Sequence, residues 1–249
     1  MQTYAVVNSK GGVGKTTIAV NLGHGLARRG HRVLLIDADQ QGNCSVWLAV
    51  EQAQTTLFDV LMGDAGLDAA IVQARENLYI VPSGGDALGA MTYYLQEQRT
   101  PATVLQEALE RVASNFDWCL IDCAPSRTLV HTLAVVASDG VLVPVNMEWL
   151  AVVGGAQAAR AIGQVAERYQ LDVAVKLVIP TFMDRRRRRA CNEIMEMLDK
   201  QYEGKVAPAI RINSRISEAP GYGQTVYDRG DKRGIEDFER LVERVLEIG

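Results

Sequence analysis

Short apolar runs alternate with longer amphipathic segments along most of this chain. Each run predicts a buried strand, and the runs lie at residues 4–7, 32–36, 78–81, 117–121, 140–145, 174–179 and 209–212. The longer segments predict helices, at residues 16–29, 101–113, 154–169, 190–202 and 235–248. Because continuous apolar strands alternate with helices, the pattern indicates a mostly parallel sheet with helices on both faces. We therefore expect one doubly wound α/β domain spanning residues 1–249.

Composition places the chain among ordinary globular proteins. Of its 249 residues, 48% are hydrophobic, which is too many for a disordered chain and enough for a large core without disulfides. The formal net charge of −4 argues against a protein whose whole surface coats nucleic acid. Positive charge is nevertheless concentrated at one point, where five arginines stand in succession at 185–189.

Neither a disulfide framework nor a membrane span is expected. The cysteines are few and scattered, so we expect buried thiols in a reducing compartment; they are Cys44, Cys119, Cys123 and Cys191. No secretory leader pattern precedes the first strand. The most apolar stretch, 141–153, contains Asn146 and Glu148 and is shorter than the ~18 residues that a membrane span needs. We expect a soluble, cytoplasmic protein.

The strongest motif lies between the first predicted strand and the first predicted helix. From Ser9 to Thr17 it reads S-K-G-G-V-G-K-T-T. Glycines let the backbone N–H groups of such a loop wrap a phosphate at the helix N-terminus. Lys15 would then reach the β- and γ-phosphates, and the Thr16 hydroxyl would bind Mg²⁺. The loop departs from the common pattern G-x-x-x-x-G-K-[ST], because Ser9 replaces the first glycine and Lys10 adds a second lysine.

Acidic residues follow two of the predicted strands. Asp37 and Asp39 come after the strand at 32–36, and Asp122 comes after the strand at 117–121. Open α/β sheets bind ligands at the carboxyl ends of their strands, so we expect these carboxylates beside the phosphate loop. A carboxylate there can hold Mg²⁺ or orient an attacking water. The alternative is that all three are ordinary turn aspartates.

With these residues in view, the chain resembles the ParA/MinD family of deviant-Walker P-loop ATPases, and within it the Soj-like ParA branch. The loop K-G-G-V-G-K-T carries part of the resemblance. Three further segments carry the rest: D-A-D-Q-Q-G-N at 37–43, D-C-A-P at 122–125 and N-S-R-I-S-E-A-P at 213–220. They follow the family's order, and the match covers most of the chain.

The resemblance implies an ATPase that forms a homodimer around ATP and Mg²⁺. Lys10 would cross to the partner's phosphates, in a role like that of an arginine finger. Asp39 would position the attacking water, whereas Asp37 and Asp122 would support Mg²⁺ together with Thr16. Hydrolysis would be slow until a ParB-like or adaptor protein stimulates it.

The resemblance also implies the residues that surround the nucleotide. They are Lys10, Gly11, Gly12, Val13, Gly14, Lys15, Thr16, Thr17 and, as an adenine contact, Asn146. The stretch 181–183 either flanks the base or packs as an ordinary loop.

Soj-like family members bind DNA without sequence preference as the ATP dimer and release it after hydrolysis. Such a cycle positions a cargo, which is a plasmid, a chromosome or a protein assembly. Arg215 matches the arginine that carries DNA binding in this branch, and phosphate neutralisation by arginine is sequence-independent and salt-dependent. Further phosphate contacts are expected from Arg185, Arg186, Arg187, Arg188 and Arg189. Side chains on a helix point around its circumference, so these five cannot all face one surface, and a solvated helix start is the alternative.

Three other functions are weighed against this one. A MinD-like membrane-cycling ATPase needs a basic amphipathic C-terminal helix, but the polar face at 235–248 is mainly acidic and anionic lipid would repel it. An iron–sulfur ATPase needs cysteines at the dimer face, whereas Cys119 lies in a predicted buried strand. A nucleotide-switched scaffold with little hydrolysis is disfavoured, because Lys15, Asp39 and Asp122 are all present.

Overall fold

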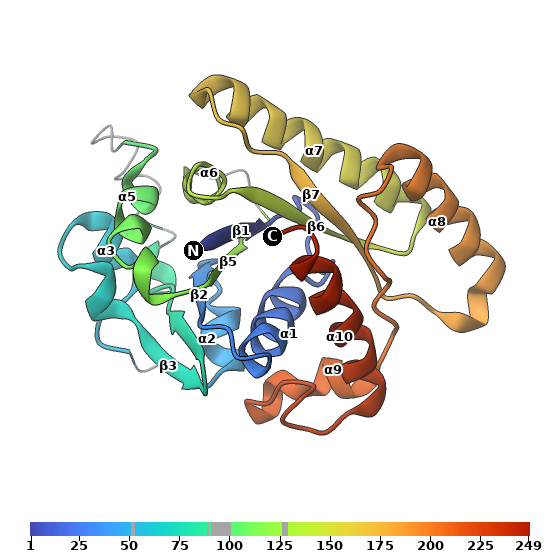
Figure 1. Cartoon of the computed structure of the whole chain (residues 1–249), viewed down its shortest axis with the longest axis horizontal. Helices are drawn as coiled ribbons and strands as arrows, with labels where there is room; N and C mark the ends of the chain where they lie inside the picture. Colours follow the sequence, from blue (N-terminus) through green and yellow to red (C-terminus); the bar gives the residue numbers. More distant parts are fainter. Residues whose placement is uncertain (51–52, 89, 91–100, 126–128) are drawn as a thin grey trace.

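The computed structural model of the chain describes residues 1–50, 53–88, 90, 101–125 and 129–249 (Figure 1). Seven strands form one sheet in the order β3-β4-β2-β5-β1-β6-β7. They are β1 (Gln2–Val6), β2 (Val33–Ala38), β3 (Val72–Arg75), β4 (Leu78–Val81), β5 (Trp118–Cys123), β6 (Gly140–Asn146) and β7 (Val175–Thr181). The pairings are parallel except at the edge, where β3 runs antiparallel to β4. The predicted mostly parallel sheet is therefore confirmed.

Helices cover both faces of the sheet, as the doubly wound pattern predicts (Figure 1). One face carries α1 (Lys15–Arg28), α2 (Asn43–Trp47) and α10 (Lys232–Leu246). The other carries α3 (Leu57–Met62), α5 (Val104–Glu110), α6 (Leu129–Val136), α7 (Trp149–Tyr169) and α8 (Arg188–Gln201). The chain also forms short elements, among them η1 (Leu67–Ala70), η2 (Ala113–Asn115), η3 (Arg185–Arg187), α9 (Ser214–Glu218) and η4 (Ala219–Tyr222).

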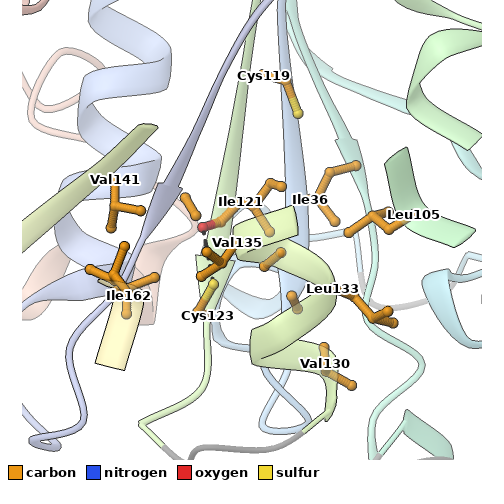
Figure 2. Packing of buried hydrophobic residues seen from close by; sticks show 14 of the residues in the cluster. Ile36, Leu105, Cys119, Ile121, Cys123, Val130, Leu133, Val135, Val141 and Ile162 are labelled. Carbon is orange, nitrogen blue, oxygen red and sulfur yellow. Dashed lines mark hydrogen bonds between the residues drawn. The ribbon is translucent and has the colours of Figure 1, made fainter. Parts of the chain in front are cut away.

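Strand alternation decides which face each side chain of β5 reaches. Cys119, Ile121 and Cys123 pack in the core that includes α6, and Figure 2 shows them on that side. Leu120 packs in the opposite core, with α1. Because successive side chains point to opposite faces, Asp122 shares the α1 face with Leu120. The alternation thus turns the acidic side chain of β5 toward the phosphate loop and the two cysteines away from it.

The C-terminal helix α10 is a core element. The centre of its apolar stripe is fully buried, with Phe238, Leu241 and Val245 at 0% exposure. The contact with α1 is close, because a Cβ at Gly25 of α1 would collide with Val242 of α10 and with Tyr227, which precedes that helix. The stripe that a membrane-binding helix would need is therefore packed inside the protein, as the acidic polar face predicts. Among the described residues, no helix combines the length and the apolarity that a bilayer crossing requires.

Two sequence predictions are wrong in detail. The strand predicted at 209–212 does not form. This segment instead runs beside the end of β7, where one isolated bridge pairs Met183 with Arg211. Pro180 and Pro208 lie in the two facing segments and offer no N–H group, so a continuous ladder cannot be built there. The helix predicted at 101–113 is shorter, since α5 begins three residues after Pro101 and ends at Glu110.

Candidate functional site

The loop between β1 and α1 adopts the conformation that its glycines allow. Gly12 and Gly14 have φ values of 69° and 90°, in the left-handed region that other residues rarely adopt. Gly14 is the N-cap of α1, whose first turn lines a cleft of about 330 Å³. The lining residues are Gly11, Gly12, Gly14, Lys15, Thr16, Thr17, Asp39, Gln41, Asn43, Pro125 and Phe182. Val13 is buried, and its carbonyl oxygen accepts a hydrogen bond from the Thr181 hydroxyl at 2.9 Å.

Lys15 brings a positive charge to the wall of this cleft. Its side chain is buried, and Nζ lies 3.5 Å from the carbonyl oxygen of Lys10. Burial lowers the pKa of Lys15, while the carboxylates of Asp122 and Asp39 act in the opposite direction. A buried ammonium group with such a long hydrogen bond is a strong site for an anion such as a phosphate.

Asp37 and Asp122 lie side by side at the carboxyl ends of β2 and β5, where they are partners in the strand register. Both are buried. Oδ2 of Asp122 accepts hydrogen bonds from the Thr16 hydroxyl at 2.7 Å and from the Cys44 thiol at 3.3 Å. Oδ2 of Asp37 accepts hydrogen bonds from the backbone N–H and the hydroxyl of Ser45, at 2.9 and 2.6 Å.

The second oxygen of each carboxylate differs from the first in its hydrogen bonding. Asp37 Oδ1 and Asp122 Oδ1 are buried and meet no hydrogen-bond donor among the described residues. Burial raises the pKa of Asp122 to about 7, and the charge of Asp37 adds to the effect. Burial likewise raises the pKa of Asp37 to about 6, although hydrogen bonds from Ser45 oppose it. Two such carboxylates beside the Thr16 hydroxyl form an oxygen donor set that fits a hard divalent cation such as Mg²⁺.

Asp39 lines the same cleft as Lys15 and Thr16. It is buried, and its Oδ1 accepts a hydrogen bond from the backbone N–H of Gln41 at 3.0 Å. A carboxylate held in this way lines the same cleft as the groups expected to bind the phosphates. It can therefore orient a water molecule beside those phosphates.

Lys10 lies outside the phosphate cleft. Its Nζ donates hydrogen bonds to Asn146 Oδ1 at 3.2 Å and to Glu148 Oε2 at 2.9 Å. The ion pair is at the surface, with the side chains of Lys10 and Glu148 41% and 57% exposed. The hydrogen bond from Lys10 lowers the pKa of Glu148. The sequence motif does not reveal this contact, because Glu148 lies 138 residues later in the chain.

A second cleft of about 340 Å³ adjoins the first, and Gly12 and Phe182 line both. Asn146, expected at the adenine, lies in this second cleft. Phe182 has a φ of 57°, an uncommon conformation for a bulky residue, and such residues gather at ligand sites. The remaining lining residues are Met147, Glu148, Asp184, Arg187, Cys191 and Ile212.

The five consecutive arginines are all exposed but have different surroundings. Arg186 pairs with Asp184, with Nη2 and Oδ2 2.9 Å apart, and Arg189 pairs with Glu193. Arg187 lines the second cleft beside Asn146. The run spans η3 and the start of α8, where successive side chains point around the helix axis, so we do not expect all five to face one surface.

Arg215 is exposed in a surface pocket of about 490 Å³ that it shares with Lys232 and Arg233. Asn213, Ser214, Gly230 and Asp231 complete the lining. Lys232 and Arg233 begin α10, where two cations oppose the helix dipole instead of complementing it. Sequence reasoning missed these two residues, since their stretch mixes acidic and basic side chains and only the fold brings it beside Arg215.

Comparisons with known proteins agree with this geometry. Residues 1–175 match a family model described as an AAA domain. The chromosome partitioning protein ParA of Caulobacter vibrioides is 40% identical over 236 residues, which is 91% of this chain and 86% of the relative. The sporulation initiation inhibitor protein Soj of Bacillus subtilis is 36% identical over 98% of each chain.

Two solved structures extend the comparison to three dimensions. A McdA variant from Cyanothece, in complex with ATP, superposes with a TM-score of 0.86 at 26% identity, covering 100% of this chain and 97% of the other. The septum site-determining protein MinD of Pyrococcus horikoshii, with Mg-ADP, superposes with a TM-score of 0.78 at 26% identity, covering 98% and 95%.

Proposed function

This chain belongs to the ParA/MinD family of P-loop ATPases, and we propose that it is a partition ATPase whose ATP- and Mg²⁺-bound homodimer holds non-specific DNA. One observation carries the proposal: a single cleft is lined by Lys15, Thr16 and Asp39, while Lys10 stands outside it at the surface. Since all the described strands share one sheet, we treat residues 1–249 as a single ATPase domain. The names of the ParA and Soj relatives support the assignment to partition.

Within one subunit, the phosphate loop supplies the binding energy. The N–H groups of Gly11, Gly12 and Gly14 and the ammonium group of Lys15 neutralise the phosphates, and the second cleft takes the base beside Asn146. Thr16, Asp37 and Asp122 would hold Mg²⁺, which when bound would withdraw charge from the phosphates.

Dimerisation completes the catalytic site. Lys10 leaves Glu148 and crosses to the partner's phosphates, where its charge stabilises the transition state. Asp39 orients the attacking water. Among the described residues that line the cleft, Asp39 is the one carboxylate and no stronger general base stands beside it, so we expect slow intrinsic hydrolysis that a ParB-like or adaptor protein accelerates.

DNA binding is assigned to the pocket around Arg215. Lys232 and Arg233 add two charges there, and the N-terminal dipole of α10 also favours an anion. A dimer presents this pocket twice, so a chain with a net charge of −4 still offers a basic surface. The arginines at 185–189 are proposed to add peripheral contacts, and Arg187 is proposed to act at the nucleotide cleft as well. Such a protein works in the cytoplasm, on the nucleoid, and moves a plasmid, a chromosome or a protein assembly.

Sedimentation velocity with Mg-ATP and with Mg-ADP tests the nucleotide switch. We expect Asp39→Ala to remain dimeric in ATP, because it binds the nucleotide but does not hydrolyse it. The wild type should be monomeric in ADP, and Lys10→Ala should be monomeric in both. An Asp39→Ala protein that stays monomeric in ATP, or that hydrolyses ATP faster than the wild type, would refute the proposed switch.

A further inference from the structure

Cys44 is the member of the acidic cluster that the proposed function does not use. It is fully buried in α2, and its Sγ lies 3.3 Å from Asp122 Oδ2. The sulfur of Cys44 and one carboxylate oxygen from each of Asp37 and Asp122 all lie within 4.8 Å of one another. Three potential metal ligands therefore converge at one buried point.

An independent observation indicates that this point can accept a cation. Thr16, Cys44 and Ser45 donate their hydrogen bonds to the Oδ2 atoms alone. Asp37 Oδ1 and Asp122 Oδ1 are buried without a donor among the described residues. A desolvated carboxylate oxygen without a donor is costly, and a coordinated cation removes that cost.

The spacing fits a small four-coordinate ion. Ligand atoms bonded to Zn²⁺ at about 2.0–2.3 Å in a tetrahedron stand about 3.5 Å apart. The 3.3 Å separation of Cys44 Sγ and Asp122 Oδ2 is close to this spacing. The three ligand atoms lie within 4.8 Å of one another, so the Asp37 carboxylate would move closer on binding. Three protein ligands leave the fourth position for water, the arrangement of catalytic zinc sites.

The donor set also selects the kind of ion. Mg²⁺ takes oxygen ligands and gains nothing from sulfur, whereas a thiolate favours Zn²⁺ and related soft ions. Binding forms a metal–sulfur bond and breaks the S–H bond of Cys44, and the proton leaves to solvent. The thiolate and two carboxylates then carry three negative charges, which the divalent ion and the nearby ammonium group of Lys15 balance.

The phosphate cleft lies next to this buried point. Asn43, which directly precedes Cys44, lines that cleft, and so does Thr16, which contacts Asp122. We propose that Asp37, Cys44 and Asp122 form a binding site for a thiophilic divalent cation of the Zn²⁺ or Cd²⁺ type. This site overlaps the proposed Mg²⁺ site. The proposal depends on the geometry of the three residues and does not depend on the DNA-binding cycle.

Titration of the reduced, nucleotide-free protein with Cd²⁺ alone tests this site. We expect a sulfur-to-metal charge-transfer band in the ultraviolet that saturates at one Cd²⁺ per chain, with release of a proton. Cys44→Ala and Cys44→Ser should both abolish the band, and Asp122→Asn should weaken Cd²⁺ binding at least about tenfold. The matched control is Cys119→Ala, which removes an equally buried thiol from the opposite face of the sheet and should keep the band.

Three results would overturn the proposal. They are a wild type without the band, a band that persists in both Cys44 variants, and a band that Cys119→Ala removes. Circular dichroism of each variant shows whether it is folded, and the serine variant keeps the test valid if the alanine variant does not fold. Because no nucleotide or DNA is present, a failure here is separate from a failure of the partition function.

Discussion

The hydroxyl of Thr16 donates a 2.7 Å hydrogen bond to Oδ2 of Asp122, and this contact joins the phosphate loop to the carboxyl end of β5, 106 residues later in the chain. The same carboxylate is buried next to Asp37, its partner in the strand register. The first turn of α1 is thus fixed to a pair of acids whose joint ionisation is costly. If a cation binds at this point, as proposed, it relieves that cost, and we then expect stability and cation binding to be coupled there.

Asp122→Asn should stabilise the nucleotide-free protein at pH 8. Burial raises the folded-state pKa of Asp122 to about 7, far above its value in the unfolded chain. The penalty on the folded state is therefore full above about pH 7, decreases as the pH falls below 7, and is gone only below the unfolded-state pKa of 3.8. We expect the variant to gain about 1–3 kcal/mol in the free energy of unfolding at pH 8 and much less at pH 5. Urea denaturation at both pH values measures this, and a variant less stable than the wild type at pH 8 would count against it.

His24→Gln should reduce the loss of stability in acid. His24 is buried, with Nδ1 2.7 Å from the Thr225 hydroxyl, and burial lowers its pKa to about 4. The unfolded chain takes up this proton near pH 6.5, so the wild type is fully stable above that pH and loses stability between 6.5 and 4. The loss from this group amounts to about 3 kcal/mol at most.

The free energy of unfolding is measured for the wild type and for His24→Gln at pH 7.5 and pH 4.5. The difference between the two proteins gives the contribution of His24. Asp37 and Asp122 change stability in the opposite direction over this range, since their folded-state pKa values are raised, but they do so in both proteins. The wild type should therefore lose more stability than the variant. Equal losses would show that His24 does not carry the acid sensitivity.

Lys15→Ala and Lys10→Ala should separate nucleotide binding from dimerisation. The first removes the buried ammonium group from the cleft and should weaken ATP binding by about 10- to 100-fold, the worth of a charged hydrogen bond. The second changes only a surface ion pair and should leave the ATP affinity of the monomer within about threefold. Calorimetric titration with ATP, on protein dilute enough to be monomeric, makes the comparison. An equal loss in both variants would contradict separate roles.

Trp149 should report dimer formation by fluorescence. It is 59% exposed at the start of α7, next to Glu148, whereas Trp47 and Trp118 are 4% and 6% exposed. If Lys10 crosses to a partner, this surface meets the partner as well, and Mg-ATP should shift the emission to the blue. Trp149→Phe should abolish the shift, and Trp47→Phe should retain it. A shift that survives in Trp149→Phe would place the dimer interface elsewhere.

The features that the sequence predicted correctly are those that depend on closely spaced residues and on the ends of strands. The phosphate loop, the parallel sheet and the positions of Asp37 and Asp122 all follow from local patterns, because parallel strands bring their carboxyl ends to one edge. It did not predict contacts that only the fold creates, such as Cys44 with Asp122 or Lys232 with Arg215. Long-range pairs of this kind leave no periodic signal.

Local patterns also predicted one strand that does not form and missed one that does. The apolar run at 209–212 resembles a strand, but proline in the facing segments removes the donors that a ladder needs. The edge strand β3 (72–75) was missed because its burial is partial and its pattern short. Its antiparallel pairing to β4 depends on a turn at Asn77, where φ is 59°.

The most direct test of the central claim is binding to a random-sequence DNA duplex with Mg-ATP, with Mg-ADP and without nucleotide, at two salt concentrations. We predict tight binding only with ATP, and a steep decrease in affinity with salt, because counterions are released from the phosphates. Arg215→Glu and Lys232→Glu should weaken binding and lower the salt dependence, by about one unit in log–log slope for each cation removed from a DNA phosphate. Lys200→Glu makes the same charge change on the exposed surface of α8 and should have little effect. Binding that is absent in every state, or equal in all three, would contradict the account.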